Sequence, residues 1–135
     1  MLKIALSGCN GRMGRAITDI CEKKENMKIV AGFDVNAVKL ADFPVYADPM
    51  EYTGGADVVI DFSNVSCTDS LLKYCLENRT PVVICTTGHS PEQLAQIGAA
   101  ATQIPVFRSG NMSVGINLLM DLLRKCGSVL GDGYD

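Results

Sequence analysis

The chain has 135 residues, enough for one domain but short for a two-domain enzyme. Its formal net charge is −3, and its lysines and arginines are scattered, so nothing marks a surface for nucleic acid. No signal-like segment opens the chain, and no apolar stretch approaches the roughly 20 residues that a membrane span needs. We therefore expect a cytoplasmic protein that binds neither nucleic acid nor membrane.

Strand-like and helix-like segments alternate from the first residues onward. An apolar run over residues 2–6 predicts a strand, and residues 11–24 follow a helical pattern with two lysines in the last turn, where cations suit the helix dipole. The side chains expected to face the core from this helix are Met13, Ile17, Ile20 and Cys21. Residues 27–34 form a second strand-like run, and residues 36–53 suggest a loop with at most one short strand.

Further strands and helices are predicted in the second half of the chain. Ser66 and Asp69 resemble a capping box at the start of a helix. The segment SPEQ at residues 90–93 supplies an N-cap serine, a first-turn proline and a capping glutamine for a helix that reaches about residue 103. A long helix with an apolar stripe follows at residues 114–130. The remaining strand-like runs cover residues 56–62, 81–85 and 105–108.

Strands separated by helices imply right-handed crossovers and a parallel sheet that is covered on both faces. The sequence therefore predicts an α/β fold with a Rossmann-type, doubly wound parallel sheet and helices on both faces. Because the cysteines form no C-x-x-C pair and fall within strand or helix patterns, we expect reduced and mostly buried thiols. The single histidine, His89, cannot complete a metal site with cysteines this dispersed, so we expect no metal.

Gly8, Gly11 and Gly14 follow the first strand and open the first helix. A glycine triplet alone is weak evidence, because glycine also serves tight turns that bind no ligand. Here, however, backbone N–H groups and the positive end of the helix dipole converge where a pyrophosphate would lie. Asp34 ends the second strand, 20 residues beyond Gly14, where a carboxylate accepts hydrogen bonds from ribose hydroxyls. The alternative is that Asp34 is a turn residue.

The segment GCNGRMGR resembles the Gly-x-x-Gly-Arg-Met-Gly-Arg signature of the dihydrodipicolinate reductases of bacterial lysine biosynthesis. Three further segments follow in the order and spacing of that family: DFS at 61–63, CTTG at 85–88 and SGNMSVGIN at 109–117. The resemblance covers the whole chain but only the nucleotide-binding part of the family. It implies an oxidoreductase of the diaminopimelate route that passes hydride from NAD(P)H to a cyclic dihydrodipicolinate-type substrate, yielding tetrahydrodipicolinate.

The resemblance also implies a cofactor site, which fits the carboxyl ends of the predicted strands. Asp34 would hold the adenosine ribose, and Phe62 and Ser63 would line the cleft. The residues implied around the pyrophosphate are Gly8, Cys9, Asn10, Gly11, Arg12 and Met13. The residues implied around the nicotinamide are Cys85, Thr86, Thr87, Ser109, Gly110, Asn111 and Met112. The alternatives are that Phe62 is core, that the threonines satisfy backbone groups, and that Asn111 caps the last helix.

Two features depart from the family pattern. Cys85 stands where the family usually has glycine, and a cysteine at a strand end also suggests a nucleophile, as in semialdehyde dehydrogenases, with His89 nearby. The chain also stops before the family's Glu-x-His-His-x-x-Lys and Asp-Ala-Pro-Ser-Gly-Thr segments, which bind the cyclic dicarboxylate and supply the proton. We therefore expect no catalytic residue in this chain and no activity from it alone.

These observations predict a dinucleotide-binding domain over residues 1–130, with residues 131–135 beginning a substrate and oligomerisation domain that is otherwise absent. The family assembles largely through that second domain, so we expect a homotetramer for the complete protein and a monomer or weak dimer for this chain. Asp34 favours NADH, with NADPH as the second cofactor. Two alternatives stay open: a non-catalytic module that senses dinucleotides, and the nucleotide-binding half of a semialdehyde dehydrogenase.

Overall fold

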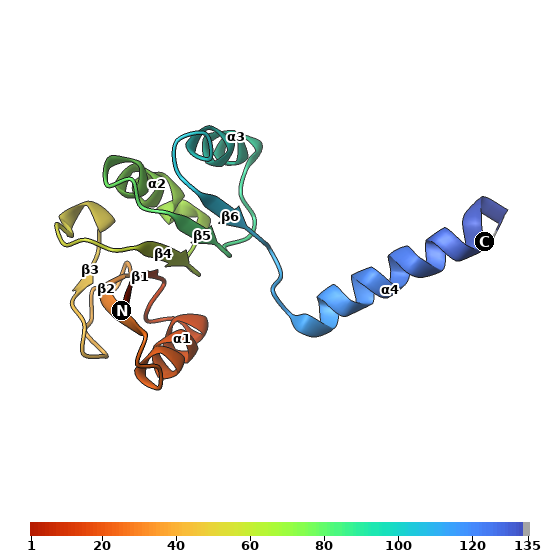
Figure 1. Cartoon of the computed structure of the whole chain (residues 1–135). Coiled ribbons are helices and arrows are strands. Elements are labelled where there is room, and N and C mark those ends of the chain that lie inside the picture. The colour runs from red at the N-terminus through yellow and green to blue at the C-terminus, as the bar shows by residue number, and fades with distance from the viewer. Residues whose placement is uncertain (134–135) are drawn as a thin grey trace.

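The computed structural model describes residues 1–133. They form a six-stranded parallel sheet with the order β3-β2-β1-β4-β5-β6, together with the helices that connect its strands (Figure 1). The chain builds the sheet outward from β1 in both directions, so the predicted doubly wound parallel sheet is confirmed. The strands are β1 (Leu2–Ser7), β2 (Met27–Phe33), β3 (Val45–Tyr46), β4 (Val58–Asp61), β5 (Val82–Ile84) and β6 (Val106–Arg108). The α-helices are α1 (Arg12–Glu22), α2 (Thr68–Glu77), α3 (Pro91–Ala100) and α4 (Val114–Leu130). Short 3₁₀ turns are η1 (Pro49–Glu51), η2 (Val65–Cys67) and η3 (Gly131–Gly133).

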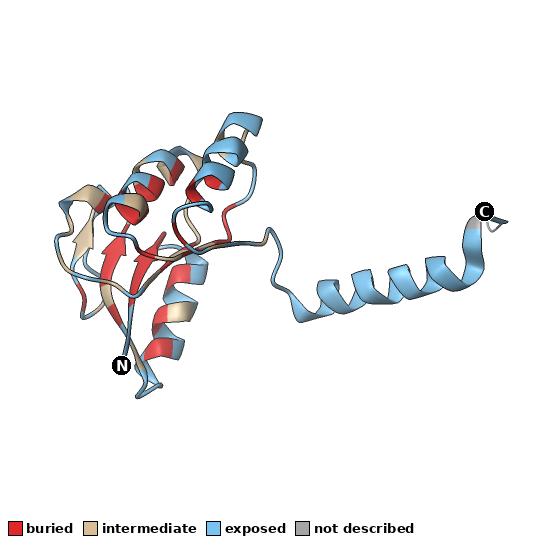
Figure 2. Cartoon of the chain, turned by 45° about the horizontal axis from the view of Figure 1, so that its top comes forward, coloured by how far each residue is buried: buried red, intermediate tan, exposed pale blue. Residues whose placement is uncertain are grey.

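Helices cover both faces of the sheet, as predicted (Figures 1 and 2). Because successive strand side chains point to opposite faces, Ile4 and Leu6 of β1 join one core cluster and Ala5 joins the other. The first cluster lies under α1 and includes Cys21, whereas the second lies under α2 and α3 and includes Tyr74. These two clusters hold the sheet in place and fix the loops at its carboxyl edge.

The buried face of α1 differs from the predicted one. Cys21 is buried and Ile17 packs against the first cluster, but Met13 and Ile20 are 50% and 56% exposed. The buried residues of α1 are Gly14, Thr18 and Cys21. They recur at helical spacing, and the helix is turned this way because Gly14 lies against the backbone of the preceding turn. The helix also ends at Glu22, before the two lysines that were expected in its last turn.

The capping box predicted at the start of α3 is confirmed. The Ser90 hydroxyl accepts from the Gln93 backbone N–H at 3.2 Å, and the Gln93 side-chain oxygen accepts from the Ser90 backbone N–H at 3.1 Å. The helix ends at Ala100, three residues before the expected boundary. The segment 36–53 contains one short strand, β3, as expected, together with η1.

The capping box predicted at Ser66 and Asp69 is wrong. The Asn64 side chain accepts a hydrogen bond from the Ser66 backbone N–H at 3.0 Å and so caps η2 instead. Because η2 runs directly into α2, the cap serves the first turn of the combined segment, and α2 begins at Thr68 without a side-chain cap. The capping signal was therefore present in the sequence two residues earlier than assigned.

Helix α4 has the predicted bounds and extends away from the sheet (Figures 1 and 2). Ser113 caps its start, with its hydroxyl accepting from the Ile116 backbone N–H at 3.4 Å. None of its residues is buried in the described part of the chain, and Leu118 and Leu123 are 59% and 62% exposed. Among residues 1–133, no helix has both the length and the apolar character required to cross a membrane.

We expect Gly14→Ala to lower the free energy of unfolding by about 1–3 kcal/mol, because a methyl group there would collide with the carbonyl oxygens of Gly8 and Cys9. Gly98 in α3 is the matched control, since a methyl group there meets nothing within 4 Å. Gly98→Ala should stabilise the domain by about 0.5–1 kcal/mol through helix propensity. Urea unfolding followed by circular dichroism measures the free energy of unfolding of the two variants. Equal values for Gly14→Ala and Gly98→Ala would contradict this account.

Candidate functional site

The turn between β1 and α1 lies at the carboxyl edge of the sheet and requires glycine. Gly8 has a φ of +74°, and a side chain there would collide with the backbone carbonyl of Phe62. Its N–H donates to Phe33 O at 2.8 Å, which ties the turn to the end of β2. Gly11 is the N-cap residue of α1 and has no side chain to accept a hydrogen bond, so the first N–H groups of the helix are available to an anion.

Asp34 follows β2 and contacts the glycine turn. Its Oδ2 accepts from the Asn10 backbone N–H at 3.0 Å, and its Oδ1 accepts from the Asn36 backbone N–H at 3.1 Å. The Asp34 backbone N–H in turn donates to Tyr46 O at 3.0 Å. The carboxylate is thus held in one orientation, and each oxygen keeps a lone pair for a further donor. The sequence analysis predicted Asp34 at the end of the second strand, and the structure places it directly after β2, but the sequence did not reveal these two backbone donors.

A hollow of about 210 Å³ lies between the glycine turn, Asp34 and the end of β4. Residues predicted for the site that line it are Gly8, Gly11, Asp34, Phe62 and Ser63. The structure adds seven lining residues that the sequence analysis did not assign: Ser7, Phe33, Val35, Ala47, Pro49, Asn64 and Cys67. These seven carry no motif, and the signal available was that most of them lie at or just after the ends of β1, β2, β3 and β4.

The loop after β4 is braced by Asp61, a buried carboxylate that the sequence analysis did not assign. Its Oδ1 accepts from the Ser63 backbone N–H at 3.1 Å and also from the Ser63 hydroxyl. Phe62 is half-buried, joins neither core cluster and lines the hollow, so the alternative that it is core is not supported. Asp61 therefore sets the position of the loop that faces Gly8.

Residues 85–87 and 109–112 meet further along the same edge, at the ends of β5 and β6. The Cys85 Sγ lies 3.8 Å from the Met112 Sδ, and the Cys85 and Ser109 backbone N–H groups donate to neighbouring strands. Thr87 is exposed, whereas Thr86 is buried, and its hydroxyl has no hydrogen-bond partner in the described chain. A buried hydroxyl without a partner is costly, so this hydroxyl is available to a further hydrogen-bond partner.

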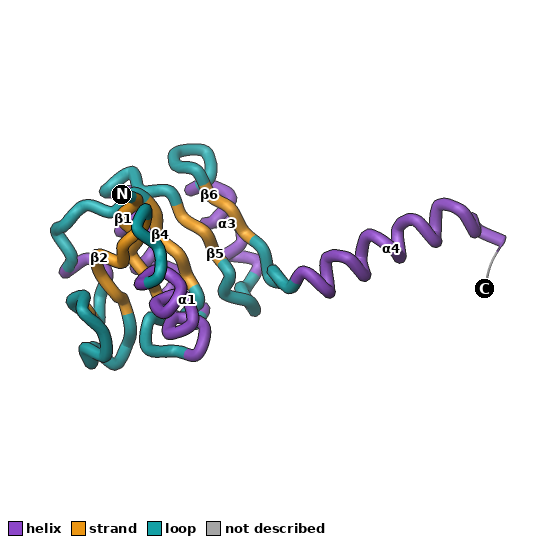
Figure 3. Tube along the Cα trace, turned by 60° about the horizontal axis from the view of Figure 1, so that its bottom comes forward, coloured by secondary structure: helices purple, strands orange, loops and turns teal. Residues whose placement is uncertain are grey.

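The segment that joins β6 to α4 is a loop that leads away from the sheet (Figure 3), and its side chains form hydrogen bonds with its own backbone. The Ser109 hydroxyl donates to Asn111 O at 3.0 Å, and the Asn111 side chain accepts from the Ser113 backbone N–H at 2.8 Å. Ser113, and not Asn111, caps α4, so the alternative role considered for Asn111 is wrong. Gly110 lies beside Thr87, because a Cβ there would contact the Thr87 methyl group at 3.5 Å.

Four residues predicted for the glycine turn do not line the hollow: Cys9, Asn10, Arg12 and Met13. The Cys9 side chain is 3% exposed and belongs to the core under α1, so only its backbone faces the site. Arg12 and Met13 are exposed on the first turn of α1. Their contribution to a ligand site would come from the helix N-terminus and from the Arg12 guanidinium.

Cys85 does not have the properties of a nucleophile. Burial, and then the negative charge of Asp61, raise the pKa of its thiol to about 11, so the thiol is protonated at neutral pH. His89 does not activate it, because both ring nitrogens are buried without a hydrogen-bond partner in the described chain. The six cysteines are all free, as predicted, although Cys67 is only half-buried and Cys126 is exposed.

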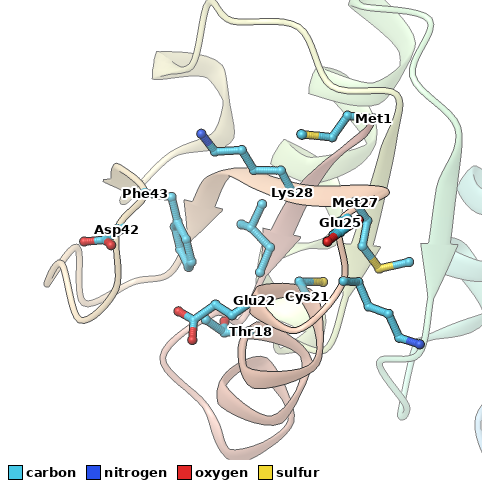
Figure 4. A pocket seen from close by; sticks show the side chains of 11 residues that line it. Met1, Thr18, Cys21, Glu22, Glu25, Met27, Lys28, Asp42 and Phe43 are labelled. Atoms are coloured by element: carbon cyan, nitrogen blue, oxygen red, sulfur yellow. The ribbon is translucent and has the colours of Figure 1, made fainter.

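A second hollow of about 320 Å³ lies at the opposite edge, where β1 and β2 begin (Figure 4). Cys21, Met27 and Phe43 contribute apolar surface to it, and Glu22 and Lys28 add charge. It lies away from the glycine turn and Asp34, so it does not belong to the candidate site. Within residues 1–133, no group of three or more His, Cys, Asp or Glu side chains is arranged to hold a metal ion.

A glycine turn opening α1, an acidic residue after β2 and polar loops along the carboxyl edge of a doubly wound sheet define a dinucleotide-binding domain of Rossmann type. Residues 2–112 match the family model described as dihydrodipicolinate reductase, N-terminus. The chain belongs to this family.

Known relatives agree with that assignment. The chain is 43% identical to the 4-hydroxy-tetrahydrodipicolinate reductase of Clostridium novyi, over 100% of this chain and 54% of that protein. It is 43% identical to the enzyme of the same name from Caldanaerobacter subterraneus, over 100% of this chain and 53% of that protein. The chain therefore spans about half the length of the curated relatives it matches.

Solved structures support the same fold. A dipicolinate-bound dihydrodipicolinate reductase from Paenisporosarcina sp. superposes with a TM-score of 0.79 at 25% identity, over 94% of this chain and 54% of that one. A myo-inositol dehydrogenase from Corynebacterium glutamicum gives a TM-score of 0.67 at 17% identity, over 98% of this chain and 43% of that one. The second likeness concerns the fold alone.

We expect iodoacetamide at neutral pH to modify Cys126 in the folded chain and to leave Cys85 unmodified. Cys126 is exposed on α4, whereas Cys85 is 8% exposed and its raised pKa of about 11 keeps the thiolate scarce. Modification of Cys85 should increase only as the pH rises towards that value, or when urea unfolds the chain. Peptide mass spectrometry measures the extent of modification at Cys85 and at Cys126. Equal rates of modification of the two thiols at neutral pH would show that Cys85 is an activated thiol.

Proposed function

We propose that this chain is the nicotinamide dinucleotide-binding part of a 4-hydroxy-tetrahydrodipicolinate reductase in the diaminopimelate route to lysine. The observation that carries the proposal is one hollow bounded by the glycine turn, Asp34 and the Phe62–Ser63 loop, in a chain of this family. When bound, NADH or NADPH supplies the hydride for a cyclic dihydrodipicolinate-type substrate. The cofactor-bound half of the enzyme would be formed by residues 1–130.

The glycine turn fits a pyrophosphate. The N–H groups of Gly8, Asn10 and Gly11 already donate within the chain and shape the turn, so the pyrophosphate would meet the Cys9 N–H, the uncapped N–H groups of the first turn of α1 and the positive end of its dipole. The absence of a Cβ at Gly11 leaves room for the close approach of phosphate oxygens. Arg12 and Met13 would complete the binding surface from the first turn of the helix. Asp34 would accept hydrogen bonds from the adenosine ribose, since each of its oxygens keeps a free lone pair.

The loops after β5 and β6 fit the nicotinamide end. We infer that Thr86 directs its unpartnered hydroxyl towards the bound cofactor or substrate. The accompanying residues on this side would be Cys85, Thr87, Ser109, Gly110, Asn111 and Met112. The protonated, buried thiol of Cys85 would act as an apolar wall against Met112 and not as a nucleophile. This property argues against the alternative of a semialdehyde dehydrogenase, which needs an activated thiolate.

We assign substrate binding and proton delivery to a second domain, which residues 131–135 would begin. The relatives that this chain matches are about twice its length, and one is described as dipicolinate-bound. A cyclic dicarboxylate is therefore the proposed class of substrate for the complete protein, and a homotetramer its proposed assembly. The exposed leucines of α4 fit a helix that is covered in a longer protein.

We expect NADH to bind this chain about 5- to 150-fold more tightly than NADPH, because a 2′-phosphate would lose a hydrogen bond and face the Asp34 carboxylate. Asp34→Ala should narrow this difference, and Arg12→Ala should widen it by removing the nearby cation. Lys28→Ala, which removes a charge from the opposite edge of the sheet, is the control and should leave the ratio unchanged. Isothermal titration calorimetry at moderate salt measures each affinity, and equal or tighter binding of NADPH would contradict the role of Asp34.

We also expect no measurable reduction of substrate by this chain alone, because proton delivery by a positioned acid contributes orders of magnitude in rate. The assay follows NADH absorbance with the condensation product of pyruvate and aspartate semialdehyde. Turnover near the ~10 s⁻¹ of a typical enzyme would overturn the assignment of chemistry to a second domain. The reading frame beyond residue 135 separates the alternatives: a His-His-x-x-Lys segment supports the reductase, and a stop codon favours a dinucleotide-sensing module.

A further inference from the structure

Asn10 in the glycine turn joins three other segments of the chain. Its backbone N–H donates to Asp34 Oδ2 at 3.0 Å, and its backbone oxygen accepts from Arg15 Nε of α1 at 3.1 Å. Its side-chain Nδ2 donates to the carbonyl oxygens of Asn36 at 2.8 Å and of Val38 at 3.0 Å. A single residue therefore links the turn to the end of β2, to the loop that follows β2 and to the first helix.

These contacts close a ring of hydrogen bonds around the Asp34 carboxylate. Asn36 returns its own backbone N–H to Asp34 Oδ1 at 3.1 Å, while its carbonyl oxygen accepts from Asn10. The Asn10 nitrogen has two hydrogens, and each carbonyl oxygen takes one of them. Pyrophosphate binding by a glycine turn needs only backbone N–H groups, so it does not account for a carboxamide at this position.

We propose that Asn10 is a positioning residue that sets the preference for the unphosphorylated adenosine ribose. Its side-chain amide anchors loop 36–38 against the turn, which keeps the Asn36 N–H on Asp34 and fixes the carboxylate in the orientation that receives the 2′-hydroxyl. The anchor also holds Val38, the residue directly before Lys39, which is the first cation after Asp34. A released loop would let Lys39 approach a 2′-phosphate. The inference rests on the proposed dinucleotide function.

The test compares NADH and NADPH affinities of three variants by calorimetry. Asn10→Ala removes the anchor, and Asn10→Leu keeps the approximate size of the side chain without a charge and removes both donors. The matched control is Asn36→Ala, because Asn36 takes part through its backbone atoms and the substitution keeps the anchor. We expect both Asn10 variants to weaken NADH binding about 5- to 30-fold and NADPH binding less than about 2-fold. The control should leave both affinities and their ratio unchanged.

The ratio of the two affinities separates positioning from a general loss of structure. A purely structural role for Asn10 would weaken NADH and NADPH alike, and an unchanged ratio in Asn10→Ala would overturn the inference while leaving the proposed function intact. If the unmutated chain bound neither cofactor, the proposed function and the inference would both fail. Equal affinity of the unmutated chain for the two cofactors would overturn the inference. Thermal denaturation checks that each variant folds, and Asn10→Leu serves if Asn10→Ala does not fold.

Discussion

The close approach of backbones at the β1–α1 turn is the constraint on which the rest of this domain depends. Gly8 adopts a positive φ against the Phe62 carbonyl, and Gly14 lies directly on the turn from the helix side. Neither position has room for a Cβ. The turn therefore contacts the ends of β2 and β4 and the first residues of α1 at one point. That contact orients α1 on the sheet and directs its uncapped N-terminus towards the same edge at which Asp34 and the Phe62–Ser63 loop emerge.

Two carboxylates stabilise that edge by accepting backbone hydrogen bonds. Asp34 connects the glycine turn to the loop after β2, and Asp61 holds the loop after β4. Hydrogen bonds to charged acceptors contribute more than neutral ones, and their geometry is fixed before any ligand arrives. The Asp61 charge also contributes, after burial, to the raised pKa of Cys85, which keeps that thiol neutral beside Met112. The same buried carboxylate thus positions a loop and adds to the effect of burial on the neighbouring thiol.

Local signals predicted the elements, whereas contacts between distant segments decided the details. The SPEQ capping box and the bounds of α4 follow from neighbouring residues, and both are confirmed. The prediction of the buried face of α1 was wrong at Met13 and Ile20, which the apolar periodicity placed in the core. The close approach of backbones at Gly14 instead turns small residues of the helix towards the sheet. Asn10 lies in the GCNGRMGR segment and Asp61 in the DFS segment, but neither segment predicts the contacts of its side chain. The Asn10 side chain donates to the carbonyl oxygens of Asn36 and Val38, and only the folded arrangement brings these groups together. Asp61 accepts hydrogen bonds from Ser63, which directly follows the end of its strand.

The core of the domain is complete without α4. Every residue of the two core clusters lies at or before Val106, and α4 begins at Val114 with none of its residues buried in the described chain. The glycine turn, Asp34 and the Phe62–Ser63 loop are therefore supported by a unit that buries its own apolar surface. The segment 109–112 is different, because it connects that unit to an exposed helix. The proposed adenosine end of the site therefore lies on the self-contained core, whereas the proposed nicotinamide end includes a segment held by its own hydrogen bonds that leads into an exposed helix.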